Sequence, residues 1–170
     1  MKPTTIRLRA LEPSDAQTLF EWENDPVTWD AGSRRWPISL ADIKALIEHS
    51  DLDIWHTRQV RFMIERTDNG ETVGCVDIFD FDPLNMHCSV GVLVKHDARR
   101  QGFAREAIRQ VCTFARETLL ANAILATAAA DNDASIALFT SAGFSECGRL
   151  KGWIRRQMNF VDEVLLIKTL

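Results

Sequence analysis

Residues 90–104 read Val-Gly-Val-Leu-Val-Lys-His-Asp-Ala-Arg-Arg-Gln-Gly-Phe-Ala, an apolar run that leads into a basic loop containing one glycine. An all-apolar run such as residues 90–94 predicts a strand buried on both faces, near the centre of a sheet. From Ala104 to Leu119, apolar residues recur at the spacing of one helix face. This stretch therefore predicts a strand–loop–helix unit, around which the other elements are arranged.

The loop at residues 99–104 suits the binding of an anion. A helix N-terminus leaves about four backbone N–H groups unpaired and carries roughly half a positive charge. Gly102 lets a phosphate approach this backbone closely, and Arg99 and Arg100 add positive charge. The same residues also suit an ordinary basic connection with a capping glycine, so two interpretations stay open for the loop taken alone.

The flanking segments alternate between strand and helix patterns. Residues 5–10 alternate with period two, as a half-buried strand does. Pro13 suits the first turn of a helix, and Ser14 with Gln17 has the spacing of a capping box. The predicted order is βααβββαβαββ, a mixed α/β (α+β) architecture in a single domain over residues 1–170. We expect further helices over residues 39–50 and 132–143 and further strands over residues 61–65, 72–79, 87–94, 124–129, 144–150 and 160–170.

Composition narrows the class of protein. The chain of 170 residues is 46% hydrophobic and has a net charge of −4, which argues against a nucleic-acid partner, since such partners need a basic face. No apolar run reaches the roughly 18 residues that span a membrane, and the first residues lack an apolar signal core, so a cytoplasmic protein is expected. The cysteines lack the paired spacing of a zinc site, so we expect buried free thiols and no metal. They are Cys75, Cys88, Cys112 and Cys147.

Several motifs in order give the chain a resemblance to the GNAT N-acetyltransferases. Residues 99–104 match the family pattern Arg/Gln-x-x-Gly-x-Gly/Ala, which binds the pyrophosphate of acetyl-CoA in that family. The stretch from Thr5 to Asp25, with Ile-Arg-Leu-Arg-Ala-Leu-Glu-Pro-Ser-Asp and then Glu-Trp-Glu-Asn-Asp-Pro, resembles the opening of the ribosomal-protein-alanine and spermidine acetyltransferase branch. Residues 73–92 resemble its central hairpin, and residues 132–144, Asn-Asp-Ala-Ser-Ile-Ala-Leu-Phe-Thr-Ser-Ala-Gly-Phe, resemble its second signature. The resemblance covers essentially the whole chain.

The resemblance implies a fold and a co-substrate. The fold is a mixed, mostly antiparallel central sheet that is flanked by helices and splayed at its central strands. The co-substrate is acetyl-CoA, with strand backbone along its pantetheine arm and loop N–H groups at its pyrophosphate. Asn132 suits helix capping equally well, and Phe139 suits core packing. The cofactor-binding residues implied are Val92, Leu93, Val94, Arg99, Arg100, Gln101, Gly102, Phe103, Ala104, Asn132 and Phe139.

The resemblance also implies direct attack of a neutral amine on the thioester. A backbone N–H near Leu93 is expected to polarise the carbonyl, and a carboxylate or histidine to take the amine proton. Relatives often place a tyrosine acid where this chain has Phe139, and the chain contains no tyrosine. Relatives often carry a glutamate base where this chain has Ser89, whose hydroxyl can only position water. The remaining candidate bases, each equally explained as a solvated group, are Asp77, Asp80, Asp82 and His87.

Acceptor recognition is expected from the N-terminal helices and from residues 152–156. The chain has five tryptophans, and aromatic rings attract a cationic amine through cation–π contacts. We expect Trp29, Asp30 and Trp153 to contact the acceptor, although ordinary packing also explains a tryptophan. Relatives are often dimers, so a homodimer is expected.

Three functions are compatible with these residues. The main hypothesis is an N-acetyltransferase for a primary amine on a small molecule, a polyamine or a protein N-terminus. The second is a catalytically weak acyl-CoA-binding sensor, which the missing tyrosine and Ser89 favour. The third is an unrelated nucleotide-phosphate binder that uses the same loop. Turnover separates the first two, and nucleotide binding without CoA binding singles out the third.

Overall fold

The computed structural model describes residues 5–26, 36–48 and 53–170. The strands are β1 Ile6–Ala10, β2 Val60–Arg66, β3 Thr72–Asp82, β4 His87–Val94, β5 Ala123–Ala129, β6 Ser145–Arg156 and β7 Asn159–Thr169. The α-helices are α1 Ala16–Glu23, α3 Leu40–Glu48, α4 Ile54–Thr57, α5 Phe103–Glu117 and α6 Asp133–Ser141, and short 3-10 helices cover η1 Pro13–Asp15 and η2 His96–Ala98.

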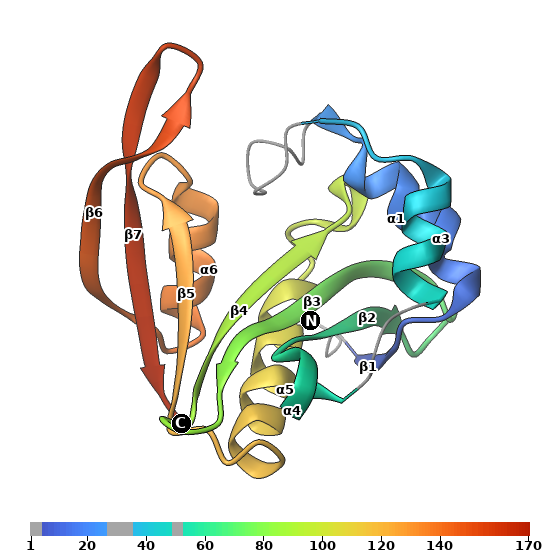
Figure 1. Ribbon diagram of the computed structural model, residues 1–170, viewed down its shortest axis with the longest axis horizontal. Coiled ribbons are helices and arrows are strands. Elements are labelled where there is room, and N and C mark those ends of the chain that lie inside the picture. Colours follow the sequence, from blue (N-terminus) through green and yellow to red (C-terminus); the bar gives the residue numbers. More distant parts are fainter. Residues whose placement is uncertain (1–4, 27–35, 49–52) are drawn as a thin grey trace.

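The strands form one seven-stranded sheet in the order β1-β2-β3-β4-β5-β7-β6 (Figure 1). Every neighbouring pair is antiparallel except β4 and β5, which are parallel. The helices flank this sheet. The predicted mixed, mostly antiparallel α/β fold is therefore confirmed, with the apolar run of residues 90–94 in the central strand β4.

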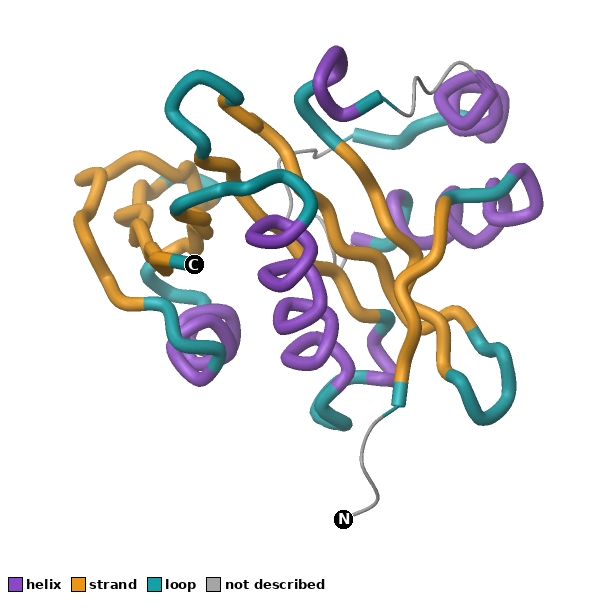
Figure 2. Tube along the Cα trace, turned by 90° about the horizontal axis from the view of Figure 1, so that it is seen from below, coloured by secondary structure: helices purple, strands orange, loops and turns teal. Residues whose placement is uncertain are grey.

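The two faces of the sheet are covered by different helices (Figure 2). On one face lies α5, whose apolar stripe of Ala107, Ile108 and Val111 is fully buried, as the helical spacing predicts. On the other face, α1 and α3 pack a smaller cluster onto the sheet. That cluster includes Leu93, so alternate side chains of β4 face different helices.

The first turn of helix is organised by Asp15 rather than by the predicted pair of Ser14 and Gln17. The buried Asp15 carboxylate accepts a hydrogen bond from the Glu12 backbone N–H at 2.9 Å. It also accepts a hydrogen bond from each of the two terminal nitrogens of Arg9, both at 2.7 Å. The Nε of Arg9 donates to Glu65 at 2.7 Å, so one guanidinium ties β1, η1 and β2 together.

Three of the four cysteines meet the expectation of buried free thiols. Burial raises the pKa of Cys75 to about 12 and that of Cys88 to about 11, so neither is an active nucleophile. Cys147 is exposed on β6, contrary to the expectation, because this outer strand has solvent on most of its length. Within the described residues, no helix is both long and apolar enough to cross a membrane.

Candidate active site

The backbone of β4 presents alternate residues to its two neighbouring strands. The Lys95 N–H donates to the Val73 carbonyl at 2.9 Å. Val73 and Lys95 lie opposite each other and are therefore one of the hydrogen-bonded pairs of the β3–β4 ladder. In an antiparallel ladder hydrogen-bonded pairs alternate with unbonded pairs, and the register has no shift between Gly74 and Phe79. Gly91 and Leu93 therefore bond to β3, while Val92 and Val94 direct their backbone groups toward β5.

The strands β4 and β5 part after a short parallel contact. Their register joins His87 to Ala123 and ends with Ser89 opposite Leu125. In the described chain, no residue of β4 beyond Ser89 pairs with β5, and the two strands diverge in Figure 1. The splay implied by the family resemblance is therefore present. It leaves the N–H and C=O of Val92 without a strand partner.

This register narrows one expectation, a carbonyl-polarising N–H on a residue near Leu93. Leu93 itself stands opposite Cys75 in a hydrogen-bonded pair, so its own N–H points into the ladder. The N–H groups that face the opening between the strands belong to Val92 and Val94. The Val94 carbonyl accepts a hydrogen bond from Nε of Arg99 at 3.0 Å. Of the Val94 backbone groups, the N–H is therefore the one left to bind a ligand in the opening.

Beyond β4 the chain turns into the N-terminus of α5. Arg100 and Gly102 both take left-handed backbone angles, with φ of 61° and 87°. The first bond of the helix runs from the Glu106 N–H to the Gly102 carbonyl at 3.1 Å. The N–H groups of residues 103–105 consequently have no acceptor inside the helix. Such a helix start binds anions, and it lies at the end of the strand whose backbone is open.

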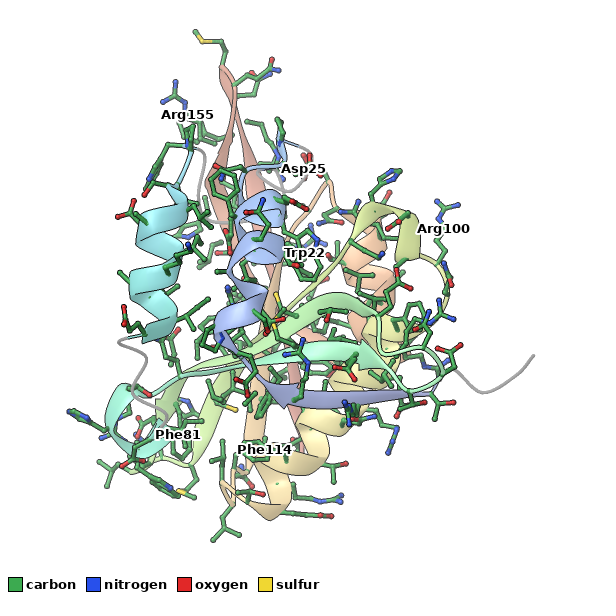
Figure 3. The ribbon with its side chains drawn as sticks, turned by 90° about the vertical axis from the view of Figure 1, so that its right-hand side faces the viewer. Trp22, Asp25, Phe81, Arg100, Phe114 and Arg155 are labelled. Atoms are coloured by element: carbon green, nitrogen blue, oxygen red, sulfur yellow. The ribbon has the colours of Figure 1, made fainter. Side chains whose placement is uncertain are left out.

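The charge around this helix start is only partly neutralised. Lys95 is bound by Glu71 and lies 3.5 Å from Asp97, and hydrogen bonding by Glu71 raises the pKa of Lys95. In contrast, Arg100 and Arg105 are exposed and have no ion pair within the described residues. The Arg100 side chain extends away from the body of the molecule in Figure 3. Two arginines are thus available to phosphate oxygens.

The second signature is placed on α6. The Asn132 side chain accepts the Ser135 backbone N–H at 3.1 Å, so it caps α6, and its amide NH2 group remains to donate. Phe139 is 4% exposed, and its ring packs edge-on against Phe144 with centroids 5.2 Å apart. These contacts favour the structural interpretation of Phe139, and its contact with a cofactor stays a prediction.

Asp77 lies on the sheet face covered by α1 and α3, opposite Gly91 in the register. Its two carboxylate oxygens accept hydrogen bonds from Nε and Nη2 of Arg61, at 2.7 and 2.9 Å. Although burial lowers the pKa of Arg61, its hydrogen bonds to Asp77 raise that pKa overall, so the pair is a fixed ion pair. Arg61 also lies 3.4 Å from Glu23 of α1. Asp77 is therefore a fixed charge beside β4, rather than a free carboxylate.

The other candidate bases lie near the turn between β3 and β4. Asp82 accepts a hydrogen bond from the Asn85 side chain at 2.8 Å. This bond, together with hydrogen bonds from backbone N–H groups of the turn, lowers the pKa of Asp82 to about 2. His87 is half-exposed and lies 3.7 Å from Asp82, at the start of β4 where the strands still pair. Ser89 is half-buried at the last paired position, where the opening begins. Of these residues, Ser89 lies nearest to the opening.

Of the predicted acceptor contacts, Trp153 lies in the part of the chain that the structure describes. Trp153 is 66% exposed on β6, next to the bend at Gly152. Trp29 and Asp30 lie outside the described residues. Contact of these residues with an acceptor stays a prediction.

Sequence reasoning does not find the Arg61–Asp77 pair beside β4. The pattern places Arg61 only within a strand, because a partner sixteen positions away along the chain cannot be recognised before the register of β2 and β3 is known.

The fold and this site define an N-acetyltransferase of the GNAT family. The family model for the acetyltransferase (GNAT) domain matches residues 5–145, and the chain belongs to this family. Two curated relatives from Bacillus subtilis (strain 168) are each 27% identical. The uncharacterized N-acetyltransferase YoaA aligns over 86% of this chain and 83% of its own length. The SPbeta prophage-derived uncharacterized N-acetyltransferase YokL aligns over 94% of this chain and 86% of its own length.

Solved structures share the fold at lower identity. The spermidine N-acetyltransferase from Vibrio cholerae, crystallised in complex with CoA and spermine, superposes with a TM-score of 0.86 at 19% identity, covering 96% of this chain and 95% of that chain. A probable acetyltransferase superposes with a TM-score of 0.84 at 22% identity, covering 96% of this chain and 92% of that chain. These likenesses extend over nearly the whole of each chain.

Proposed function

We propose that this protein transfers an acetyl group from acetyl-CoA to a primary amine by direct attack. One observation carries the proposal: the unpaired backbone of β4 at Val92 runs directly into the helix start at Gly102. The four residue-to-residue steps from Val90 to Val94 span about 13 Å at about 3.3 Å per step. An extended amide-bearing arm with phosphates at one end suits this arrangement.

The residues have distinct proposed roles toward the donor. The N–H groups of residues 103–105 bind the pyrophosphate, and Arg100 adds charge from the exposed side. The backbone of Val92 binds the pantetheine amides or the thioester carbonyl, whose polarisation favours attack. The bound thioester supplies an activated acyl carbon and a thiolate leaving group. The overall change joins the amine nitrogen to the acyl carbon, breaks the carbon–sulfur bond, and moves one amine proton to the thiol.

Proton transfer is proposed to proceed through water rather than through a dedicated tyrosine. Phe139 has no acidic proton and is buried, and Ser89 at the start of the opening can hold a water by its hydroxyl. A CoA thiolate leaves without prior protonation more readily than an alkoxide does, because a thiol is far more acidic. Turnover without a tyrosine acid is therefore compatible with this site.

The acceptor class is proposed as a small primary amine, with polyamines the first to test. The spermidine N-acetyltransferase that shares this fold was crystallised with spermine, and Asp77 puts a carboxylate beside β4. A second candidate is an acyl-CoA sensor with little turnover, which the fixed Arg61–Asp77 pair and the buried Phe139 favour.

One experiment distinguishes the two candidates. CoA binding is measured by calorimetry, with ATP and NAD as competitors, and thiol release from acetyl-CoA is measured with spermidine, spermine, an aminoglycoside and an N-terminal alanyl peptide. Amine-dependent thiol release supports the transferase. Tight CoA binding without release across the panel supports the sensor, and nucleotide binding without CoA binding contradicts both.

A further inference from the structure

Gly74 of β3 is pressed against the backbone of β4. A Cβ at this position would lie 3.0 Å from Cα of Val94 and 3.2 Å from the carbonyl carbon of Leu93, and closer still to the Leu93 carbonyl oxygen. All three atoms belong to the strand backbone, which cannot turn aside as a side chain can. The φ of Gly74 is not left-handed, so space rather than the backbone angle requires a glycine here.

The strand β3 is bent at this same point. On its β2 side, Gly74 stands opposite Ile64, whereas Thr72 stands opposite the next residue of β2, Glu65. Two successive residues of β2 thus face three of β3, and Val73 is the extra residue. Such a β-bulge bends its strand and increases the local twist, and bulges are common beside active sites. The bend and the close approach to β4 therefore coincide.

The strand β4 follows β3 where it leaves β5. Beyond Ser89, no described residue of β4 pairs with β5, whereas the pairing with β3 continues to Val94. The Lys95 N–H then donates to the Val73 carbonyl at 2.9 Å, so the chain stays on β3 to the end of the strand. The divergence of β4 from β5 is visible in Figure 1. The glycine contact with Val94 lies within this diverging stretch.

A side chain at position 74 would push β4 toward the opening. On its other side β3 is backed by β2, with Ile64 opposite Gly74, and β2 is backed in turn by β1. Ile64 and Val73 are fully buried in the close-packed core, so β3 cannot retreat. Within the described residues, no strand holds this part of β4 from the side of β5. Two carbons in ordinary contact lie about 3.5–4.0 Å apart, so the backbone at Val94 would move by about 0.5–1 Å.

We propose that Gly74 is a positioning residue for the donor: its missing side chain lets β4 lie against β3, which keeps the backbone of Val92 and Val94 in place for the pantetheine arm. This inference rests on the proposed binding of acetyl-CoA. Hydrogen bonds require donor–acceptor distances of about 2.7–3.2 Å, so a shift of β4 by about 0.5–1 Å disrupts those to the arm. Gly74 acts through β4 and does not itself contact the ligand.

The pyrophosphate end of the site should be spared by a change at Gly74. Lys95 is fixed to β3 by its N–H and to Glu71 by its ammonium group, so the loop that follows is anchored outside β4. At the start of α5, Phe103 is 6% exposed, and the guanidinium of Arg66 lies 5.6 Å from its ring centroid. The N–H groups that face the phosphates are therefore held by contacts other than those of Gly74.

The test compares Gly74→Ala with Gly148→Ala, a control variant in β6 whose added Cβ would meet one side-chain carbon, Cδ1 of Leu165, at 3.5 Å. Calorimetry gives the Kd of CoA and the Kd of 3′-phospho-ADP, the nucleotide part of CoA, which keeps the phosphates and lacks the pantetheine arm. We expect Gly74→Ala to weaken CoA binding at least tenfold and to change the Kd of the nucleotide less than twofold. Gly148→Ala is expected to change neither constant more than twofold.

Equal weakening of the two ligands by Gly74→Ala would overturn the inference, because it would show a general loss of the site. Unchanged CoA binding in that variant, or the same loss of CoA binding in Gly148→Ala, would overturn it as well. Thermal midpoints verify folding, and a Gly74→Ala protein that does not fold would also contradict the inference, since β4 could then not yield toward the opening. Failure of the wild-type protein to bind CoA would instead overturn the proposed function, so the two failures are distinguishable.

Discussion

Gly102 combines two properties that the phosphate site requires. Its φ of 87° is a left-handed angle that glycine adopts without strain, and its position as N-cap brings the free N–H groups of residues 103–105 together. Asparagine and aspartate also tolerate this angle better than other residues and have nearly the same shape. They differ in charge, which lets the anion site be tested separately from the backbone.

We expect Gly102→Asp to weaken CoA binding at least tenfold more than Gly102→Asn, about 1.4 kcal/mol or more, because its carboxylate repels the pyrophosphate. Both variants should unfold at similar temperatures, since an N-cap position accepts either residue. Calorimetric Kd values for CoA and thermal midpoints give the comparison. Equal Kd values for the two variants would argue against phosphate at this helix start.

At the scale of elements, a buried ionic cluster ties β1 and η1 to β2. Burial raises the pKa of Asp15, but its bonds to Arg9 and to the Glu12 N–H lower that pKa overall. A lowered carboxyl pKa contributes stability above the unfolded value of about 3.9, and this contribution is lost as the pH falls through the folded value. Acid should therefore loosen the attachment of β1.

We expect Asp15→Asn to lower the free energy of unfolding at pH 7 by about 3 kcal/mol, because Arg9 loses a buried partner. The difference from wild type should shrink below about pH 4, where the unfolded wild-type chain takes up a proton at Asp15. Asp68→Asn is the control: Asp68 pairs with Arg66 at an exposed position, where solvent screens the pair, so its loss should lower the free energy of unfolding far less than Asp15→Asn does. Urea unfolding between pH 3 and pH 7 measures both, and a difference independent of pH would contradict the assignment.

The strand β4 predicts an alternating pattern of amide exchange. Gly91 and Leu93 donate into the β3 ladder, whereas the N–H groups of Val92 and Val94 face the opening. In the free protein, Val92 and Val94 should exchange faster than Gly91 and Leu93, as groups without a strand partner do. Added CoA should slow Val92 most. Residue-resolved hydrogen exchange measures this, and uniform protection along β4 in the free protein would rule out the splay.

For the whole molecule, features set by local sequence were predicted well, and features set by register were not. The spacing of apolar residues from Ala104 predicted α5, and the Asn132 cap of α6 followed from its side chain. The helix cap at Asp15 was missed, because it depends on Arg9 of a neighbouring strand. Which residue near Leu93 offers its N–H to the opening could not be predicted, because only the ladder shows which backbone groups face outward.

The candidate site shows the same division between local and distant determinants. The glycine loop is contiguous, so its chemistry was readable from residues 99–104. The Arg61–Asp77 pair joins two strands and became visible only with the fold.

As a transferase, the whole molecule must bring CoA and an amine together so that an acetyl group moves from one to the other. The most direct measurement incubates the protein with acetyl-CoA carrying an isotope-labelled acetyl group and with spermidine, and follows both products by mass spectrometry. We predict labelled N-acetylspermidine and free CoA thiol in equal amounts, formed at a rate proportional to the protein concentration. Full CoA binding with no labelled amine from spermidine or any other primary amine in the panel would contradict the account.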